Sequence, residues 1–478
     1  MKTKVLNPFW LWCACFALLV ASCEKEEYNR VPDDDKLPEE VSELTKVNRF
    51  VNDCVQEYYL WSATIDWSRE YPEKETDSFA FFEKLKYADD KWSMLTDDIE
   101  ALQGEFDGNV TSFGYELIFG QFYDSEDLFA IVMYVYPGTP AEKAGLKRGD
   151  FIIGLNGGYI TRENRMELYD ASTLVLMMGI LAENGGISVD PTLIYMAAEQ
   201  VYENPILKDT VIVKGENKIG YLAYADYTQA SEEDLQRVFS DFKRRGVTDV
   251  VLDLRYNGGG YVRTMSVLTS ILAPENAVRN KEVYLRQVWN PALEAYFKKT
   301  GEDLTERFTD TLSVNMNLSR LYVLTLEYSA SASESTIVGL RPYLNLVQIG
   351  DTTHGKYCAG GLFQPQVQAG KNEWVTDKSV ANWGMYLMIY RIANKLGDDS
   401  FLGGLAPDIT AEEDYFPLYP WGDERDPLLG KAIENITGVP SAEMRAGHVR
   451  PPHTIRKDLS IVRAKDGKLI SGTGRIVR

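Results

Sequence analysis

The chain has 478 residues, 45% of them hydrophobic, and is therefore long enough to form two or three domains with substantial cores. Its formal net charge of -21 argues against nucleic-acid binding, because an acidic surface repels phosphates. The 5 cysteines and 3 histidines show no CxxC spacing and no ligand cluster, so we expect no disulfide framework, no metal site and no cofactor.

The beginning of the chain has the pattern of an export signal. Two early lysines precede the apolar run Phe9–Val20, which has the length of a signal-peptide core and is too short to span a bilayer. The run ends in Val20-Ala-Ser-Cys23, and small residues before a cysteine resemble the lipobox of bacterial lipoproteins. The resemblance implies a signal peptide over residues 1–22 and a lipid attached to Cys23. An ordinary signal peptide with a chance cysteine is the alternative.

An acidic segment, residues 23–41, follows and is predicted to be a flexible tether. Glu24 resembles the residue after the cysteine in proteins sorted to the outer membrane. Lys25-Glu-Glu27 resembles the surface-export signal of some Gram-negative lipoproteins. We therefore expect an outer-membrane lipoprotein of a bacterial cell envelope, and the export signal would place it on the cell surface.

Residues 42–104 are predicted to form a small helical N-terminal region. From Val47 to Tyr58, apolar residues recur at i, i+3 and i+4 after a Ser42 cap. The apolar face of this helix is expected to pack onto the part of the chain that follows.

Over residues 105–205 the sequence pattern changes to that of short strands, which are expected over 110–118 and 128–136. Pro140 suits the first turn of a short helix and Gly145 its end. This run resembles a PDZ domain of the bacterial, circularly permuted kind. The loop that would bind the terminal carboxylate of a peptide consists of Phe113, Gly114, Tyr115 and Glu116. A captured peptide would add a strand to the sheet edge there, while a PDZ fold used only for packing is the alternative.

From residue 206 onward strands and helices alternate, which is typical of an α/β domain. A strand is expected over 218–224, a helix from Ser231 to Gly246, and another strand over 249–255. Asn257-Gly-Gly-Gly260 then opens a further helix, and its glycines let backbone N–H groups approach a ligand closely. Taken alone, such a run is equally well a flexible turn.

The stretch 321–334 joins a buried strand, Leu321–Leu326, to a helix expected over 335–340. Three serines alternate with alanines between them, and Ser331 is the middle one. A serine at such a turn lies beside unpaired N–H groups at the positive end of the helix, which can stabilise an oxyanion. The alternative is a structural helix cap, because Ser331-x-x-Glu334 also fits a capping box.

Four motifs occur in the order PDZ-like run, Asp253–Gly260, Ser329–Glu334 and Gly350–Lys356. Together they resemble the C-terminal processing peptidases, also called tail-specific proteases, over about residues 105–408. The resemblance implies an α/β fold with a crotonase/ClpP-like catalytic core over residues 206–437. An inserted or preceding PDZ-like domain and the small helical N-terminal region would accompany this core, and residues 438–478 would form a basic tail.

The same resemblance implies a serine endopeptidase with Ser331 as the nucleophile and Lys356 as the general base. A neutral amine is needed to accept the serine proton, and burial between the apolar segments 344–349 and 358–363 would favour the neutral form. The backbone N–H donors of the oxyanion hole would belong to Gly259, Gly260 and Ala332. The supporting positions would be Glu334, Thr353 and Gly355.

The chain departs from the pattern of this family at several points. The glutamine that often follows the lysine by four residues is Gly360 here, and the nearest candidate for its role is Gln364. Pro342 replaces an acidic residue on the helix after the nucleophile, and the segment between the glycine run and the serines is long. His354 is a competing base, although a histidine in a loop is more often simply solvated.

We therefore predict a lipid-anchored serine endopeptidase of the cell envelope. It would capture unfolded or C-terminal segments of envelope proteins through the PDZ-like domain and cleave them with the Ser331–Lys356 pair. The first alternative is a catalytically inactive peptide-binding lipoprotein on the same scaffold. A second is a surface lipoprotein that binds small apolar ligands on a crotonase-like core.

Overall fold

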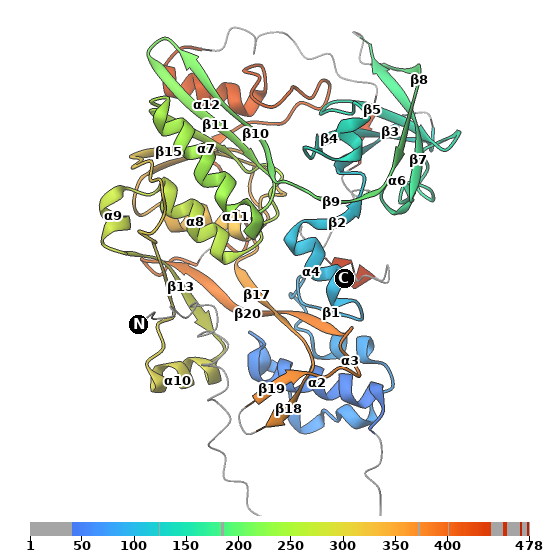
Figure 1. The fold of residues 1–478 in the computed structure, drawn as a ribbon, viewed down its shortest axis with the longest axis vertical. Helices are drawn as coiled ribbons and strands as arrows, with labels where there is room; N and C mark the ends of the chain where they lie inside the picture. The colour runs from blue at the N-terminus through green and yellow to red at the C-terminus, as the bar shows by residue number, and fades with distance from the viewer. Residues whose placement is uncertain are drawn as a thin grey trace, which may run out of the picture.

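The computed structural model describes residues 41–123, 125–182, 186–370, 373–399, 401–440 and 453–456, together with the backbone of two short strands, β23 (Leu469–Ile470) and β24 (Ile476–Val477). The predicted signal peptide, Cys23 and most of the predicted basic tail lie outside these ranges. The chain forms a helical N-terminal region, a PDZ-like domain and an α/β core (Figure 1). Among the residues described, no helix is both long enough and apolar enough to cross a bilayer.

The N-terminal region contains the helices α2 (Glu43–Tyr58), α3 (Ser78–Leu85) and α4 (Ile99–Asp107), the strand β1 (Met94–Thr96) and three 3-10 helices, Ser62–Thr64, Trp67–Arg69 and Pro72–Lys74. As predicted, Ser42 caps α2, because its hydroxyl accepts a hydrogen bond from the Thr45 N–H. Val47 on α2 is fully buried in a cluster that contains Phe81 of α3 and Leu387 of the core. The apolar face of α2 therefore packs against the core, as its periodicity predicts.

The PDZ-like domain consists of β2 (Asn109–Ser112), β3 (Tyr115–Phe122), β4 (Leu128–Val135), α5 (Pro140–Lys143), β5 (Phe151–Leu155), β6 (Gly158–Tyr159), α6 (Glu167–Asp170), β7 (Thr173–Leu181), β8 (Ile187–Ala197) and β9 (Glu199–Tyr202). Its antiparallel sheet has the order β22-β3-β4-β5-β7-β8, and β22 (His453–Ile455) comes from the C-terminal tail. The strand predicted over 110–118 is interrupted at Gly114, whose φ of 84° breaks the extended backbone. Strands β2 and β9 pair, so the chain enters and leaves the domain through neighbouring strands (Figure 1).

The core is organised around a six-stranded sheet of order β10-β11-β12-β15-β16-β21, in which β10 and β11 are antiparallel and the other neighbours parallel. Its strands are β10 (Ile206–Lys214), β11 (Asn217–Tyr224), β12 (Asp249–Asp253), β15 (Arg320–Thr325), β16 (Asn345–Gly350) and β21 (Ile409–Thr410). Its helices are η4 (Gln229–Ser231), α7 (Glu232–Arg244), α8 (Val262–Leu272), α9 (Glu275–Arg279), α11 (Ala332–Leu340) and α12 (Pro427–Thr437).

Both faces of this sheet are covered. Val250 and Leu252 of β12 lie in the apolar cluster with α7, α8 and α11, whereas Val251 lies in the cluster that contains Leu428 of α12. Strands buried on both faces read as continuous apolar runs, which is why these strands could be predicted. The predicted α/β class is therefore confirmed.

A second sheet connects the core to the N-terminal region. It contains β13 (Val283–Trp289), β14 (Thr305–Arg307), β17 (Cys358–Phe363) and β20 (Gly384–Asn394), and β1 of the N-terminal region pairs with β20. The helix α10 (Pro291–Thr300) follows β13, and β18 (Gln366–Gly370) forms a hairpin with β19 (Glu373–Thr376). In Figure 1, β17 and β20 run from the core toward the N-terminal region. Lys356 lies just before β17 and is therefore held by this sheet.

A buried charge cluster joins the PDZ-like domain to the core. Arg148, from the turn before β5, binds Glu413 at 2.7 Å. Arg255, just after β12, binds Asp253 at 2.8 Å, Glu413 at 3.0 Å and Asp426 at 2.8 Å. None of these five side chains is more than 5% exposed. Buried charges persist only when they are paired, so this cluster fixes the relative position of the two parts.

The cluster predicts a large loss of stability for Arg255→Met, because three buried carboxylates would lose their shared countercharge. We expect the free energy of unfolding to fall by about 3–5 kcal/mol at pH 7, measured by urea unfolding. The matched control is Arg320→Met, which breaks a partly exposed pair with Asp249 and should cost no more than about 1 kcal/mol. Equal losses in the two variants would contradict the account.

The difference between the chain and Arg255→Met should also depend on pH. Burial alone would raise the pKa of Asp426, but the Arg255 and Arg148 guanidiniums outweigh burial and lower that pKa. A carboxyl whose pKa is lower in the folded state stabilises the fold above its unfolded pKa of about 3.9. The difference in unfolding free energy should therefore be largest above about pH 4 and shrink as the pH falls further.

Candidate active site

The predicted nucleophile, Ser331, lies in the turn between β15 and α11. Helix α11 begins at Ala332, directly after the serine and three residues earlier than predicted. Ser331 has φ 57° and ψ -109°, a backbone conformation that costs a non-glycine residue about 1–3 kcal/mol. Its side chain is half-buried. Strain of this kind is typical of residues that a fold presents for chemistry.

The glycine-rich loop packs directly against this turn. A Cβ on Gly259 would lie 2.7 Å from the Ser331 Cβ and 3.1 Å from the Ala332 nitrogen, so only glycine fits there. Asn257 connects the two segments, because its carbonyl accepts hydrogen bonds from the Ala330 N–H and the Ser333 hydroxyl, both at 3.0 Å. The glycine run is therefore a structured part of the site and not a flexible turn.

The backbone N–H groups of the three predicted oxyanion donors differ in whether they are free to bind an oxyanion. The Gly259 N–H donates to the Asn257 Oδ1 at 2.9 Å and is already engaged. Ala332 is the first residue of α11, so its N–H has no acceptor within the helix. Gly260 forms a parallel bridge with Tyr227 through its neighbours, which leaves its own N–H directed away from Tyr227. Ala332 and Gly260 are thus better placed than Gly259 to bind an oxyanion.

Glu334 is the centre of the site. Its carboxylate is fully buried and accepts four hydrogen bonds. Oε2 accepts the backbone N–H groups of Ser331 and Lys356, both at 2.9 Å. Oε1 accepts the Thr353 hydroxyl and the Gly355 N–H, both at 2.6 Å. One carboxylate therefore joins the turn that carries the serine to the loop that carries the lysine.

The ionisation of Glu334 reflects two opposing effects. Burial raises the pKa of its carboxyl, and the hydrogen bonds from Thr353, Gly355, Ser331 and Lys356 lower it, with burial the larger effect. Three of these donors are backbone N–H groups, which can only donate. Both carboxylate oxygens must therefore act as acceptors for the observed geometry to hold.

The two remaining members of this loop have structural roles. The Thr353 hydroxyl oxygen accepts a hydrogen bond from the Leu405 N–H at 2.7 Å, in addition to donating to Glu334. Gly355 has a φ of 88°, and a Cβ there would lie 2.5 Å from the Leu402 carbonyl oxygen. The structure thus brings the predicted supporting residues Thr353 and Gly355 together around the same carboxylate.

The predicted general base, Lys356, is only 3% exposed. Its amine donates a hydrogen bond to the Tyr386 hydroxyl at 3.3 Å and lies 5.2 Å from the centre of that ring. Within the described part of the chain, the Lys356 amine and the Ser331 hydroxyl are not hydrogen-bonded to each other. Hydrogen bonds of this kind are often long in proteins without bound substrate and tighten in the complex.

Tyr386 is the residue that the sequence did not single out. A Cβ on Gly360 would lie 2.5 Å from the Tyr386 ring, so that ring fills the space a side chain at position 360 would need. The side-chain amide of Gln364 is directed elsewhere, to the Ala381 carbonyl at 3.3 Å. No local sequence signal could identify Tyr386, because it reaches Lys356 through the pairing of β20 with β17.

His354 lies in the same loop as Lys356. Its backbone N–H donates a hydrogen bond to the Ser329 carbonyl at 3.0 Å, and the centre of its ring lies 6.5 Å from that of the Trp92 ring in an edge-on arrangement. The histidine backbone thus helps to attach the lysine loop to the serine turn.

The predicted carboxylate-binding loop spans the connection between β2 and β3 and the first two residues of β3. Phe113 and Tyr115 are 2% exposed and stack at 5.9 Å, so their side chains belong to the core of the domain. The Gly114 carbonyl accepts a hydrogen bond from the Tyr136 N–H at 2.9 Å, and Glu116 is buried. A peptide at this loop would therefore have to bind backbone groups, which is the mode predicted for it.

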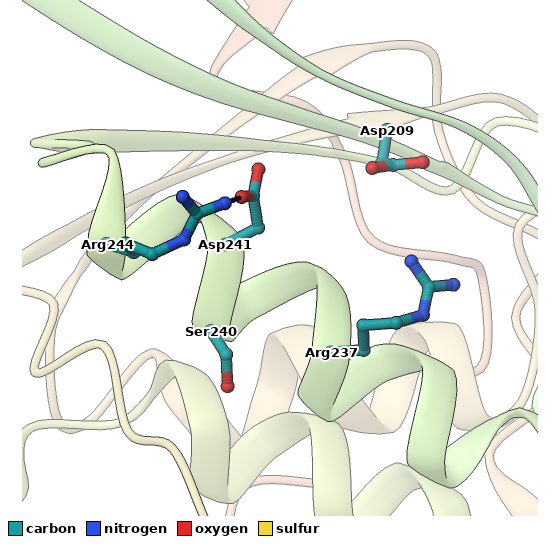
Figure 2. A pocket seen from close by; sticks show the side chains of 5 residues that line it. All are labelled: Asp209, Arg237, Ser240, Asp241 and Arg244. Carbon is teal, nitrogen blue, oxygen red and sulfur yellow. Dashed lines mark hydrogen bonds and ion pairs between the residues drawn. The ribbon is translucent and has the colours of Figure 1, made fainter.

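A pocket of about 450 Å³ lies elsewhere, between β10 and α7 (Figure 2). It is lined by Asp209, Arg237, Ser240, Asp241 and Arg244. Figure 2 shows Asp241 and Arg244 paired with each other along α7. None of the predicted site residues lines this pocket. Over the described ranges, no group of three or more His, Cys, Asp or Glu side chains could hold a metal ion.

Comparison with family models gives three matches along the chain. The model of Peptidase family S41 matches residues 218–411, which include the serine turn and the lysine loop. The model of the PDZ domain matches residues 131–170, and that of the Peptidase S41 N-terminal domain matches residues 46–94. The three matches fall within the core, the PDZ-like domain and the N-terminal region of the structure, respectively.

Comparison with individual proteins also finds S41 and carboxy-terminal processing proteases. A solved structure from Bacteroides fragilis, assigned as an S41 protease, is 26% identical with a TM-score of 0.69 and covers 85% of this chain and 100% of that chain. The chloroplastic C-terminal processing peptidase of Tetradesmus obliquus is 24% identical over 67% of this chain and 64% of its own length. The carboxy-terminal processing protease CtpB of Bacillus subtilis is 24% identical over 62% of this chain and 55% of its own length. The chain thus matches less than two thirds of the length of either curated relative.

The position of Glu334 predicts that Glu334→Gln destabilises the fold although the two side chains have the same shape. An amide nitrogen would replace one oxygen and face two N–H or O–H donors, which would leave buried donors unsatisfied. We expect a loss of about 2–3 kcal/mol in the free energy of unfolding, measured by urea denaturation. Glu233→Gln is the matched control, because Glu233 is an exposed glutamate in the first turn of α7. A Glu334→Gln chain as stable as this control would contradict the structural role of the carboxylate.

Proposed function

The chain belongs to peptidase family S41, and from this premise we propose that it is a serine endopeptidase in which Ser331 attacks the peptide bond and Lys356 acts as the general base. The observation that carries the proposal is the Glu334 carboxylate, which binds the backbone N–H groups of both residues at 2.9 Å. A carboxylate shared in this way holds nucleophile and base on two rigid segments at a fixed separation.

The reaction would proceed in two halves. In the first, the neutral Lys356 amine takes the Ser331 hydroxyl proton while the oxygen attacks the peptide carbonyl carbon. The resulting ammonium returns this proton to the leaving amine as the C–N bond breaks, and an acyl-enzyme remains on Ser331. In the second half, Lys356 takes a proton from water, the hydroxide attacks the ester, and the proton returns to Ser331. Burial of Lys356 supports this cycle, because its side chain, only 3% exposed, holds the amine inside the protein and not in open solvent.

The oxyanion that forms in each half needs donors close to Ser331. We assign this role to the N–H groups of Ala332 and Gly260. The positive end of the nine-residue helix α11 adds to the stabilisation of negative charge at Ala332. Gly259 contributes by close packing against Ser331, since its own N–H is bound to Asn257.

We assign the positioning of the lysine to Tyr386. The Tyr386 hydroxyl is the side-chain partner of the Lys356 amine, and its ring occupies the space next to Gly360. A glutamine often occupies the position of Gly360 in proteins that share these motifs, so Tyr386 would hold the amine in place of that glutamine. As a positioning residue, it would act through Lys356 without touching the substrate.

The substrates that we propose are unstructured polypeptide segments, with C-termini captured by the PDZ-like domain. The relatives named above are processing enzymes of carboxyl termini, and the loop Phe113–Glu116 offers backbone groups for a terminal carboxylate. The charge cluster around Arg148 would hold the domain that captures the peptide firmly against the core that cleaves it.

A second candidate function is peptide binding without cleavage. It is favoured by one observation, namely that the Lys356 amine is bonded to Tyr386 and not to Ser331. The distinction between the two functions is whether the amine reaches the serine when a peptide is bound.

Ser331→Ala and Lys356→Ala should each lower the rate of cleavage of an unfolded substrate, such as carboxymethylated casein, by at least about 10³-fold. The reason is that the first variant lacks the nucleophile and the second lacks the base. Peptide products are measured by mass spectrometry, and Ser240→Ala, an exposed serine on α7, is the control. Equal product formation by Ser331→Ala and the unmodified chain would remove the Ser331–Lys356 mechanism, and no product from the unmodified chain would leave the binding function as the better account.

Tyr386→Phe keeps the ring and removes only the hydroxyl that accepts the lysine hydrogen bond. We expect kcat to fall about 10-fold with little change in KM, because the amine is no longer held. A loss of stability alone would not change kcat per folded molecule, so kcat is compared at equal concentrations of folded protein. Tyr390→Phe, on the same strand, should leave kcat unchanged. An unaltered kcat in Tyr386→Phe would show that the tyrosine is merely structural.

We also propose that the mature chain is a lipoprotein of the bacterial outer membrane, anchored through Cys23. The proposal rests on the small residues before this cysteine, which lies outside the described residues. Cys23→Ala should move the expressed protein from the membrane fraction to the soluble fraction. A chain that is soluble with Cys23 intact would contradict the anchor.

A further inference from the structure

The C-terminal tail contributes a strand to the PDZ-like domain. Strand β22 pairs antiparallel with β3, with His453 opposite Phe122, Thr454 opposite Gln121 and Ile455 opposite Gly120. β3 pairs with β4 on its other side, so β22 occupies the edge that would otherwise be open. The pairing joins two parts of the chain that are more than 330 residues apart in sequence.

Successive backbone groups along this edge of β3 form hydrogen bonds with the tail and with α6. The Phe119 carbonyl accepts a hydrogen bond from the Arg456 N–H at 2.7 Å, just beyond β22. Two residues earlier on the same edge, the Leu117 N–H donates to the Tyr169 hydroxyl of α6 at 3.0 Å. From Leu117 to Gln121 the edge is therefore occupied, partly by the tail and partly by α6.

The side chains of the tail also make specific contacts. Ile455 is half-buried and packs against the apolar cluster that contains Ile118 and Phe129. The Arg456 guanidinium donates a hydrogen bond to the Gln121 side-chain oxygen. The tail is thus recognised through one aliphatic residue and the cation that follows it.

The direction of the tail matches that of a captured peptide. Because the pairing is antiparallel, residues after Ile455 lie opposite positions of β3 that come progressively closer to the loop Phe113–Glu116. A peptide that adds to β3 with its terminal carboxylate at this loop has the same direction and forms the same kind of backbone hydrogen bonds. A chain segment and a substrate therefore cannot occupy this edge at the same time.

We propose that the tail segment 453–456 is a built-in occupant of the peptide-binding edge, and that it reports the class of peptide this edge takes. The class is an extended segment with a branched aliphatic residue followed by a cation. The proposal rests on the proposed function, because capture of peptides by the PDZ-like domain is part of it. A tethered occupant competes at an effective concentration of about millimolar, so it raises the affinity that a substrate needs before it can enter.

The test measures binding of a fluorescein-labelled peptide with the sequence of residues 450–458 to the full-length chain. All chains carry Ser331→Ala so that the peptide is not cleaved, and affinity is read by fluorescence anisotropy. Arg456→Pro removes both the N–H that binds Phe119 and the guanidinium that binds Gln121, and should vacate the edge. Arg456→Ala keeps the N–H, and Arg445→Pro places a proline in the same tail outside β22.

We expect the Arg456→Pro chain to bind the peptide at least about 10-fold more tightly than the chain without tail substitutions, and Arg456→Ala to be intermediate. Arg445→Pro should bind like the chain without tail substitutions. A peptide with aspartate in place of its isoleucine should bind none of the chains. Equal affinities in all chains, or no binding to the Arg456→Pro chain, would overturn the proposal.

Cleavage of casein by the corresponding chains with Ser331 intact separates this proposal from the proposed function. Casein cleavage together with equal peptide affinities would remove the role of the tail and leave the peptidase. Tighter peptide binding by Arg456→Pro without any casein cleavage would support the tail as occupant and remove the catalytic assignment.

Discussion

The site depends on one buried carboxylate. Glu334 lies on α11 and accepts hydrogen bonds from the Ser331 turn, from Thr353, from Gly355 and from the Lys356 backbone. A carboxylate without contact to water is stable only when donors surround it, and here the donors come from the turn that carries Ser331 and the loop that carries Lys356. In the proposed peptidase, Glu334 would therefore align nucleophile and base through the backbone N–H groups of both residues, without a direct contact between their side chains.

A second buried polar contact determines how the PDZ-like domain and the core are joined. Arg148 and Arg255 share Glu413, and Arg255 also binds Asp426 at the start of α12. Arg255 precedes the glycine run that packs against Ser331, and Arg148 lies in the domain to which the proposed peptide-binding edge belongs. The tail on β3 completes this arrangement, because it lies at the edge where a substrate would enter. In the proposed function, capture, alignment and cleavage would thus be linked through buried charges and a shared sheet edge.

Much of this arrangement could be predicted from the sequence. The parts that could not be predicted have one reason in common, which is that they depend on contacts between distant segments. The strand before Ser331, the helix after it and the glycine run have local signals, namely continuous apolar residues and small residues at fixed positions. Tyr386 has no such signal, because it reaches Lys356 through the pairing of two strands. The tail strand could not be predicted either, since three residues carry no periodicity and their pairing depends on an open edge elsewhere. Helices, strands and turns with a local sequence signal could thus be predicted, whereas contacts made by the pairing of distant strands could not.

The most direct test of the central claim is a crystal structure of the Ser331→Ala chain with a bound peptide substrate. We predict that all four hydrogen bonds to Glu334 remain and that the Lys356 amine turns from Tyr386 toward residue 331, within about 3 Å of the position of a serine oxygen. A Lys356 amine directed into solvent with the peptide in place, or a Glu334 carboxylate that has released either loop, would contradict the account.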